Sequence, residues 1–171
     1  MTNPYFQSPN PALDLVLHRV VDVPCERVWA AWTQPELLMP WFCPLPWKTI
    51  ECEIDLRPGG QFRTVMQSPE GEKFPNAGCY LNIVPGRRLV WTGALSPGFR
   101  PADPTPGMPT ITAIIEMEPT GANGASTRYT ATSLHSSLEA TKQHAAMGFH
   151  SGWSTALDQM VAAIKHQLAR A

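Results

Sequence analysis

The sequence lacks any cluster of positive charge. Lysine and arginine number 13 against 14 aspartates and glutamates, the formal net charge is −1, and the longest basic runs are pairs such as Arg87-Arg88. Proteins that bind nucleic acid or an anionic membrane gather Lys and Arg on one face, because phosphate contacts supply much of that affinity. We therefore expect neither a nucleic acid nor a membrane as partner.

Long apolar runs and paired cysteines are also missing. No stretch approaches the roughly 20 apolar residues of a membrane span, and the N-terminal MTNPYFQSPNPALDL has neither the charged nor the apolar region of a signal peptide. The four cysteines have irregular spacings and no C-x-x-C pair, which predicts reduced thiols rather than disulfides or zinc ligands. These features predict a cytoplasmic protein.

The chain of 171 residues is long enough to bury one substantial core. Residues 1–12 are polar and rich in proline, which predicts a flexible leader. No linker or internal repeat divides the remainder, so we expect residues 13–171 to form a single domain. Six tryptophans and 18 prolines are the unusual features of the composition, and the tryptophans suggest broad apolar contacts, some of them around a ligand.

Apolar and polar residues alternate through much of the chain. LDLVLHRVVDV, from Leu13, predicts a first strand, and two short helices follow it, one after Pro24 and one at Pro35. Six further strands then follow as a meander of hairpins, of which Asn123-Gly124 is the strongest turn signal, and a proline-rich surface loop, SPGFRPADPTPGMP, separates the last two hairpins.

The period changes after residue 137. LEATKQHAAM has a helical pattern, and from Trp153 apolar residues recur at three- and four-residue steps, which predicts a long amphipathic C-terminal helix. The fold class is therefore α+β, with a curved antiparallel sheet of about seven strands around that helix. A sheet bent around one helix rarely fills its whole concavity, so we expect a cavity between them.

Several motifs resemble those of a known family. They are W-x-x-P-E-x-x-x-x-W, D-x-R-P-G-G-x-F-R, G-x-x-x-x-I-x-P-x-x-x-L-V-W-T and M-G-F-H-x-G-W, which begin at Trp32, Asp55, Gly78 and Met147. In this order they resemble the SRPBCC superfamily, which includes START lipid-transfer domains and polyketide cyclases, and within it the AHSA-type branch named after the activator of the heat-shock chaperone ATPase. The resemblance spans roughly residues 13–168. It implies a helix-grip fold that encloses a pocket for an apolar small molecule, and it supplies no common catalytic motif.

Strand alternation and helical spacing predict which side chains line this pocket. We expect an apolar set from the loop after the short helices, the sheet and the last helix: Trp41, Phe42, Trp47, Phe62, Met66, Cys79, Trp91, Ile115, Met117, Met147, Trp153 and Leu157. A single bulge reverses the face of every later residue in a strand. For that reason Tyr80 and Thr92 are alternatives to Cys79 and Trp91, and we include Tyr80 among the pocket candidates.

The polar candidates favour structure over chemistry. His144 and His150 are six residues apart, so they do not share a helical face as a zinc-binding H-x-x-x-H pair does. We interpret His150 as a pocket-side or partly exposed histidine rather than a general base, and Gly148 and Gly152 as sites of close packing. Alternation places the Glu51, Glu53 and Asp55 carboxylates on a solvated strand face, balanced by Lys48 and Arg57.

The remaining nucleophiles lack a catalytic context. Ser133, Ser136 and Ser137 near His135 have no nucleophile elbow, and Cys43 lacks a histidine partner, although it could lie near the pocket mouth. We therefore expect no catalytic residue, no metal and no cofactor.

Three functional hypotheses follow, in descending order. The first is non-catalytic binding of a small hydrophobic or aromatic molecule, and the second is a cyclase- or hydrolase-type enzyme that uses the same pocket. The third is a protein-interaction role, as a homodimer or a chaperone-associated module, through the proline-rich loop 96–110.

Overall fold

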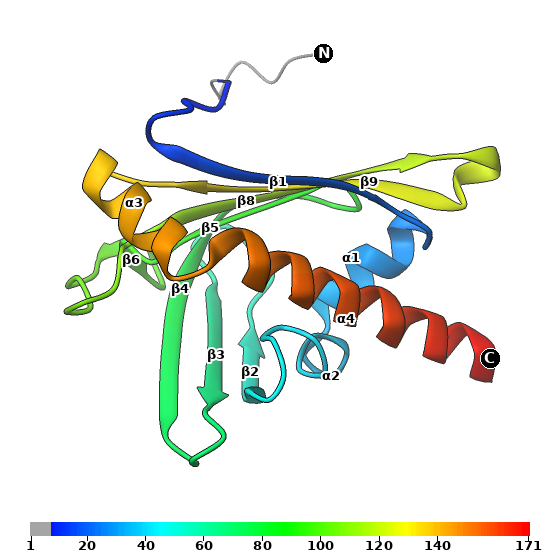
Figure 1. Cartoon of the computed structure of the whole chain (residues 1–171), viewed down its shortest axis with the longest axis horizontal. Helices are drawn as coiled ribbons and strands as arrows, with labels where there is room; N and C mark the ends of the chain where they lie inside the picture. Colours follow the sequence, from blue (N-terminus) through cyan, green and yellow to red (C-terminus); the bar gives the residue numbers. More distant parts are fainter. Residues whose placement is uncertain (1–7) are drawn as a thin grey trace.

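Figure 1 shows the computed structural model of the chain, which describes residues 8–171. The predicted leader, residues 1–12, falls partly on residues 1–7, and these lie outside the described residues. Regular structure in the described part begins with strand β1 at Asp14.

A seven-stranded antiparallel sheet forms the body of the fold. Its strands are β1 (Asp14–Val21), β2 (Lys48–Ile54), β3 (Gln61–Gln67), β4 (Lys73–Val84), β5 (Arg88–Thr92), β8 (Thr112–Thr120) and β9 (Ser126–Leu134). The spatial order is β1-β9-β8-β5-β4-β3-β2. From β2 onward each strand of this sheet pairs with the next one along the chain, and β1 pairs with the last, β9. The predicted meander is confirmed.

Within residues 8–171, four α-helices accompany the sheet: α1 (Cys25–Thr33), α2 (Pro35–Leu38), α3 (Leu138–Ala146) and α4 (Phe149–Arg170). Figure 1 shows the sheet strongly bent, with β2, β3 and β4 turned away from β1 and β9, and α4 running across the concave side. This arrangement is the predicted helix grip, in an α+β fold with two short helices after the first strand.

The core lies where the middle of α4 meets the sheet and α1. Leu157, Met160 and Ile164 of α4 are at most 2% exposed, and they belong to one apolar cluster with Ile115 and Met117 of β8. Their spacing of three and four residues places them on one face of the helix. Side chains therefore fill the concavity along this part of α4.

The structure adds three details to the predicted elements. The proline-rich loop contains a short hairpin of β6 (Leu95–Ser96) and β7 (Arg100–Pro101), and α4 begins at Phe149 rather than Trp153. The Asn123-Gly124 turn has the expected left-handed backbone, with φ of 55° and 72°.

The carboxylates of Glu51 and Glu53 pair with a different cation from the predicted Lys48. Nη1 of Arg63, on the neighbouring strand β3, lies 2.9 Å from Glu51 and 3.0 Å from Glu53. Arg57 pairs with Asp55 as predicted, at 2.8 Å. The carboxylates thus form ion pairs on the solvated face, and Arg63 takes the place expected for Lys48.

Candidate ligand pocket

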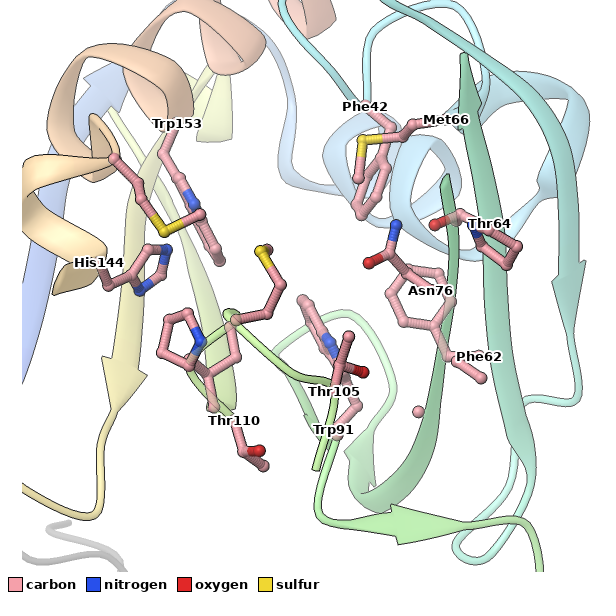
Figure 2. A pocket seen from close by; sticks show the side chains of 18 residues that line it. Phe42, Phe62, Thr64, Met66, Asn76, Trp91, Thr105, Thr110, His144 and Trp153 are labelled. Atoms are coloured by element: carbon pink, nitrogen blue, oxygen red, sulfur yellow. The ribbon is translucent and has the colours of Figure 1, made fainter. Parts of the chain in front are cut away.

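A pocket of about 280 Å³ opens near the N-terminal end of α4. Strands β3, β4 and β5 form one wall, residues 105–111 a second, and the α3–α4 junction a third (Figure 2). The side chains and backbone that line it belong to Phe42, Phe62, Thr64, Met66, Pro75, Asn76, Ala77, Gly78, Trp91, Gly93, Thr105, Met108, Pro109, Thr110, Ile111, His144, Met147 and Trp153.

Aromatic rings dominate the wall nearest the core. The ring centroids of Phe62 and Trp91 lie 5.0 Å apart in an edge-on arrangement, and Phe42 meets Phe62 in the same way at 5.7 Å. Edge-to-face packing of this kind holds each ring in one orientation. The pocket therefore has a preformed aromatic wall, with Trp153 of α4 on the opposite side (Figure 2).

The proline-rich segment forms the outer wall. Its lining residues are Thr105, Met108, Pro109, Thr110 and Ile111. The side-chain amide of Gln143 on α3 donates a hydrogen bond of 2.9 Å to the carbonyl oxygen of Gly107 and ties this segment to the helix. The loop that we expected to serve protein interaction thus contributes a wall of the pocket.

Two histidines meet at the edge of the pocket. Nε2 of His135, just beyond β9, lies 2.9 Å from Nδ1 of His144 on α3, and Nδ1 of His135 lies 2.8 Å from the carbonyl oxygen of Leu13. His135 is 7% exposed, whereas His144 lines the pocket. Burial, reinforced by the neighbouring His135, lowers the pKa of His144 to about 4. Its imidazole is consequently neutral near pH 7.

These histidines do not form a nucleophile relay with the adjacent serine. Oγ of Ser133 lies 3.4 Å from Nδ1 of His144, the same nitrogen that contacts His135. A catalytic triad needs the nucleophile on one ring nitrogen and the orienting group on the other. Ser133 is also fully buried, so it cannot reach a ligand.

The structure brings about half of the predicted pocket residues to the pocket. The residues that do line it are Phe42, Phe62, Met66, Trp91, Met147 and Trp153. The predicted residues that lie outside the lining are Trp41, Trp47, Cys79, Tyr80, Ile115, Met117, His150 and Leu157.

The residues outside the lining have identifiable positions. Ile115, Met117 and Leu157 fill the core beneath α4, and Trp41 is buried there at 3% exposure. Trp47 lies outside the lining and packs on the ring of Phe74, with ring centroids 5.2 Å apart.

The register of β4 and β5 decides between Cys79 and Tyr80, and between Trp91 and Thr92. Tyr80 pairs directly with Trp91, and the register shifts just after it, between Tyr80 and Asn82. Paired residues point to the same face of a sheet, so both rings belong to the concave side. Tyr80 is only 1% exposed and stacks on Phe62, at 5.5 Å. It therefore supports the aromatic wall from behind, while Thr92 stays outside the lining.

The glycines of the GFHSG stretch have separate structural roles. Gly148 precedes α4 in a left-handed conformation, with φ of 92°, and so allows the break between α3 and α4. Gly152 faces the loop after α2, where an added Cβ would lie 4.0 Å from Pro44. His150 is exposed and stacks edge-on against Phe149, outside the pocket.

The cysteines are all free thiols, and Cys43 is buried away from the pocket lining. Burial raises the pKa of the Cys43 thiol above its usual value, although a 3.3 Å contact with Thr49 Oγ1 partly offsets the effect. Within residues 8–171 there is no group of three or more His, Cys, Asp or Glu that could hold a metal ion. The helices in this range are all too short or too polar to cross a membrane.

Comparison with known proteins agrees with the fold. The family described as "Activator of Hsp90 ATPase homolog 1-like protein" matches residues 22–165. The chain therefore belongs to this family, which is the AHSA-type branch of the SRPBCC superfamily. Among curated proteins, none matches the sequence.

Solved structures of related proteins share the architecture. A protein from Nitrosomonas europaea is 46% identical, with a TM-score of 0.87 over 94% of this chain and 99% of that one. A protein from Arthrobacter aurescens is 25% identical, with a TM-score of 0.76 over 91% and 87%. An AHSA1 protein from Silicibacter pomeroyi, at 19% identity and a TM-score of 0.64 over 90% and 99%, shares the fold alone.

Proposed function

We propose that this protein binds a small hydrophobic or aromatic molecule in the pocket beside the α3–α4 junction and catalyses no reaction on it. The observation that carries the proposal is the preformed aromatic wall around an open volume of about 280 Å³. Small-molecule sites are commonly concave, mostly apolar and around 300 Å³ or larger. The volume therefore suits a compact ligand with a single ring or two fused rings.

The composition of the lining supports binding over catalysis. Its residues include one histidine and no carboxylate, lysine or arginine. A cyclase or hydrolase needs an acid and a base, or a nucleophile, converging on the same ligand. The family description refers to activation of a chaperone ATPase, but the loop expected to meet a protein partner contributes to the pocket wall, which also favours the ligand role. A cytoplasmic location is proposed as well, supported by the four free thiols.

A titration with naphthalene tests the proposal. Trp91 and Trp153 line the pocket, so saturable quenching of tryptophan fluorescence is expected, together with a one-to-one complex in native mass spectrometry. Asn76→Phe, which enlarges a β4 side chain that faces the pocket (Figure 2) and pairs with Thr64 of the lining, should abolish binding, whereas Val20→Phe, at an exposed position of β1, should leave it unchanged. Absence of saturable binding to the unmodified protein would falsify the proposal.

A further inference from the structure

The hydrogen bonds around the two histidines determine which ring nitrogens carry protons. The carbonyl oxygen of Leu13 can only accept, so Nδ1 of His135, 2.8 Å away, must donate to it. In a neutral His135 the other nitrogen, Nε2, then has a lone pair. Nδ1 of His144, at 2.9 Å, must be the donor to that lone pair.

The tautomer of His144 follows from this chain of contacts. A neutral imidazole that donates from Nδ1 has its lone pair on Nε2. No described residue makes a hydrogen bond to this Nε2, and the ring lies at the edge of the pocket beside Trp153 (Figure 2). His144 thus offers the pocket a hydrogen-bond acceptor whose direction is fixed from behind.

Neighbouring contacts hold the arrangement in place. The hydroxyl of Thr141 on α3 donates to the same Leu13 carbonyl, at 2.9 Å, so one oxygen anchors both His135 and the helix that carries His144. The ring of His144 also packs edge-on against Phe149, with centroids 5.2 Å apart. Because its partners are fixed before any ligand arrives, the acceptor loses little entropy on binding.

The opposite wall presents a second acceptor. Nδ2 of Asn76 donates to the carbonyl oxygen of Phe74 at 3.2 Å, and the amide oxygen Oδ1 makes no hydrogen bond to a described residue. Figure 2 shows Asn76 across the pocket from His144. The lining contains no lysine or arginine, so no opposite charge offsets the cost of desolvating a carboxylate or phosphate there.

We propose that the pocket selects neutral, planar apolar molecules that carry an O–H or N–H group, such as phenols or aromatic amines, and that this group donates to Nε2 of His144. The inference rests on the proposed ligand-binding function. The aromatic wall supplies most of the affinity, and the histidine acceptor supplies the preference for a donor-bearing ligand.

The test compares 2-naphthol with 2-methylnaphthalene, which has nearly the same shape but no donor. Dissociation constants are measured by isothermal titration near pH 7.5, where an ordinary histidine is mostly neutral. Three proteins are used: wild type, His144→Phe, and the control His150→Phe, whose histidine is exposed outside the lining. The affinity ratio of 2-naphthol to 2-methylnaphthalene should fall about tenfold in His144→Phe, the size expected for one hydrogen bond, and should stay constant in His150→Phe.

The outcomes separate the two proposals. If both probes bind wild type and the ratio is the same in His144→Phe, the donor preference is overturned while ligand binding stands. If neither probe binds wild type, both proposals fall. A long-range ¹H–¹⁵N spectrum of wild type gives a test that needs no substitution: a lone pair on Nε2 of His144 and its shift on adding 2-naphthol are expected, and a protonated Nε2 contradicts the inference.

Discussion

The side-chain amide of Gln159 on α4 donates a hydrogen bond to the carbonyl oxygen of Cys43, at 2.9 Å. The same amide nitrogen lies 3.1 Å from the carbonyl oxygen of Trp41, and its oxygen accepts from the backbone N–H of Leu45 at 3.0 Å. One helix residue therefore satisfies three backbone groups of the loop after α2. Phe42, which belongs to the aromatic wall of the pocket, lies within that loop.

Gln159→Met is expected to destabilise the protein by about 1–3 kcal/mol, because it leaves carbonyl groups without a partner while keeping a side chain of similar length. The free energy of unfolding in urea measures the effect. Gln167→Met is the matched control, since Gln167 lies on the same helix and makes no side-chain hydrogen bond to a described residue. Equal stability of the two variants would show that the loop does not depend on Gln159.

The same substitution should weaken binding of naphthalene, since the loop that positions Phe42 loses its anchor. The expected loss is several-fold, without a change in stoichiometry. Unchanged affinity in Gln159→Met would mean that the Phe42 ring is held by its neighbours alone, at 5.7 Å from Phe62 and 5.9 Å from Trp32.

The topology was predictable because local patterns and global fold agree. Alternation in β3 placed Phe62 and Met66 on one face, and both line the pocket. Tight turns join β2 to β5 and β8 to β9, whereas the β5–β8 pairing spans residues 93–111 and β1 pairs with the last strand, β9. Where each segment's own pattern matches its place in the sheet, sequence alone is sufficient.

The pocket was harder to predict because it depends on contacts between distant segments. Helical spacing indicates that Leu157 faces the sheet, but it does not tell whether the space there is empty. The pocket lies at the other end of α4 because Gly148 breaks the helix and residues 105–111 fold over the gap. Neither feature has a period that could reveal it.

The histidine pair was missed for a related reason. His144 was compared with His150, its neighbour in sequence, whereas its partner in the structure is His135 at the end of β9. One signal did exist. Tyr129, Ala131 and Ser133 of β9 pair with Met117, Ile115 and Ala113 on the inward face, and His135 continues that alternation and required a buried partner.

Two residues predicted to line the pocket should respond differently to truncation. Leu157→Ala removes a side chain that is 2% exposed within the core, so it should cost about 2–5 kcal/mol of stability. Met147→Ala removes one that is 52% exposed at the pocket mouth. It should cost under about 1 kcal/mol and should weaken naphthalene binding. Thermal unfolding and fluorescence titration separate the two effects, and the reverse order of stabilities would contradict the assignment of core and pocket.

The turn between β2 and β3 should not tolerate a side chain at Gly60. An added Cβ would lie 2.0 Å from the carbonyl oxygen of Asp55, so Gly60→Ala must move the backbone and should cost more than about 3 kcal/mol. Gly93→Ala is the control, because its nearest atoms would be 4.0 Å away, and it should change stability by less than about 1 kcal/mol. Urea unfolding of both variants checks the contrast, and a Gly60→Ala protein as stable as wild type would contradict it.

His144 should make the folded protein sensitive to mild acid. Burial beside His135 lowers the pKa of His144 to about 4, whereas in the unfolded chain a histidine takes up its proton near pH 6.5. The neutral His144 therefore contributes fully to the free energy of unfolding above about pH 6.5. This contribution is lost as the pH falls toward 4, because the unfolded chain binds the proton more readily. His144→Gln is neutral throughout, so wild type should lose stability relative to this variant as the pH falls across that range.

Urea unfolding of both proteins at several pH values measures the difference, in which carboxylates common to the two proteins largely cancel. His150→Gln, which removes an exposed histidine, serves as the matched control. Parallel curves for wild type and His144→Gln would show that His144 takes up protons as easily in the folded state as in the unfolded one. In that case the neutral acceptor at the edge of the pocket would not be held by the fold.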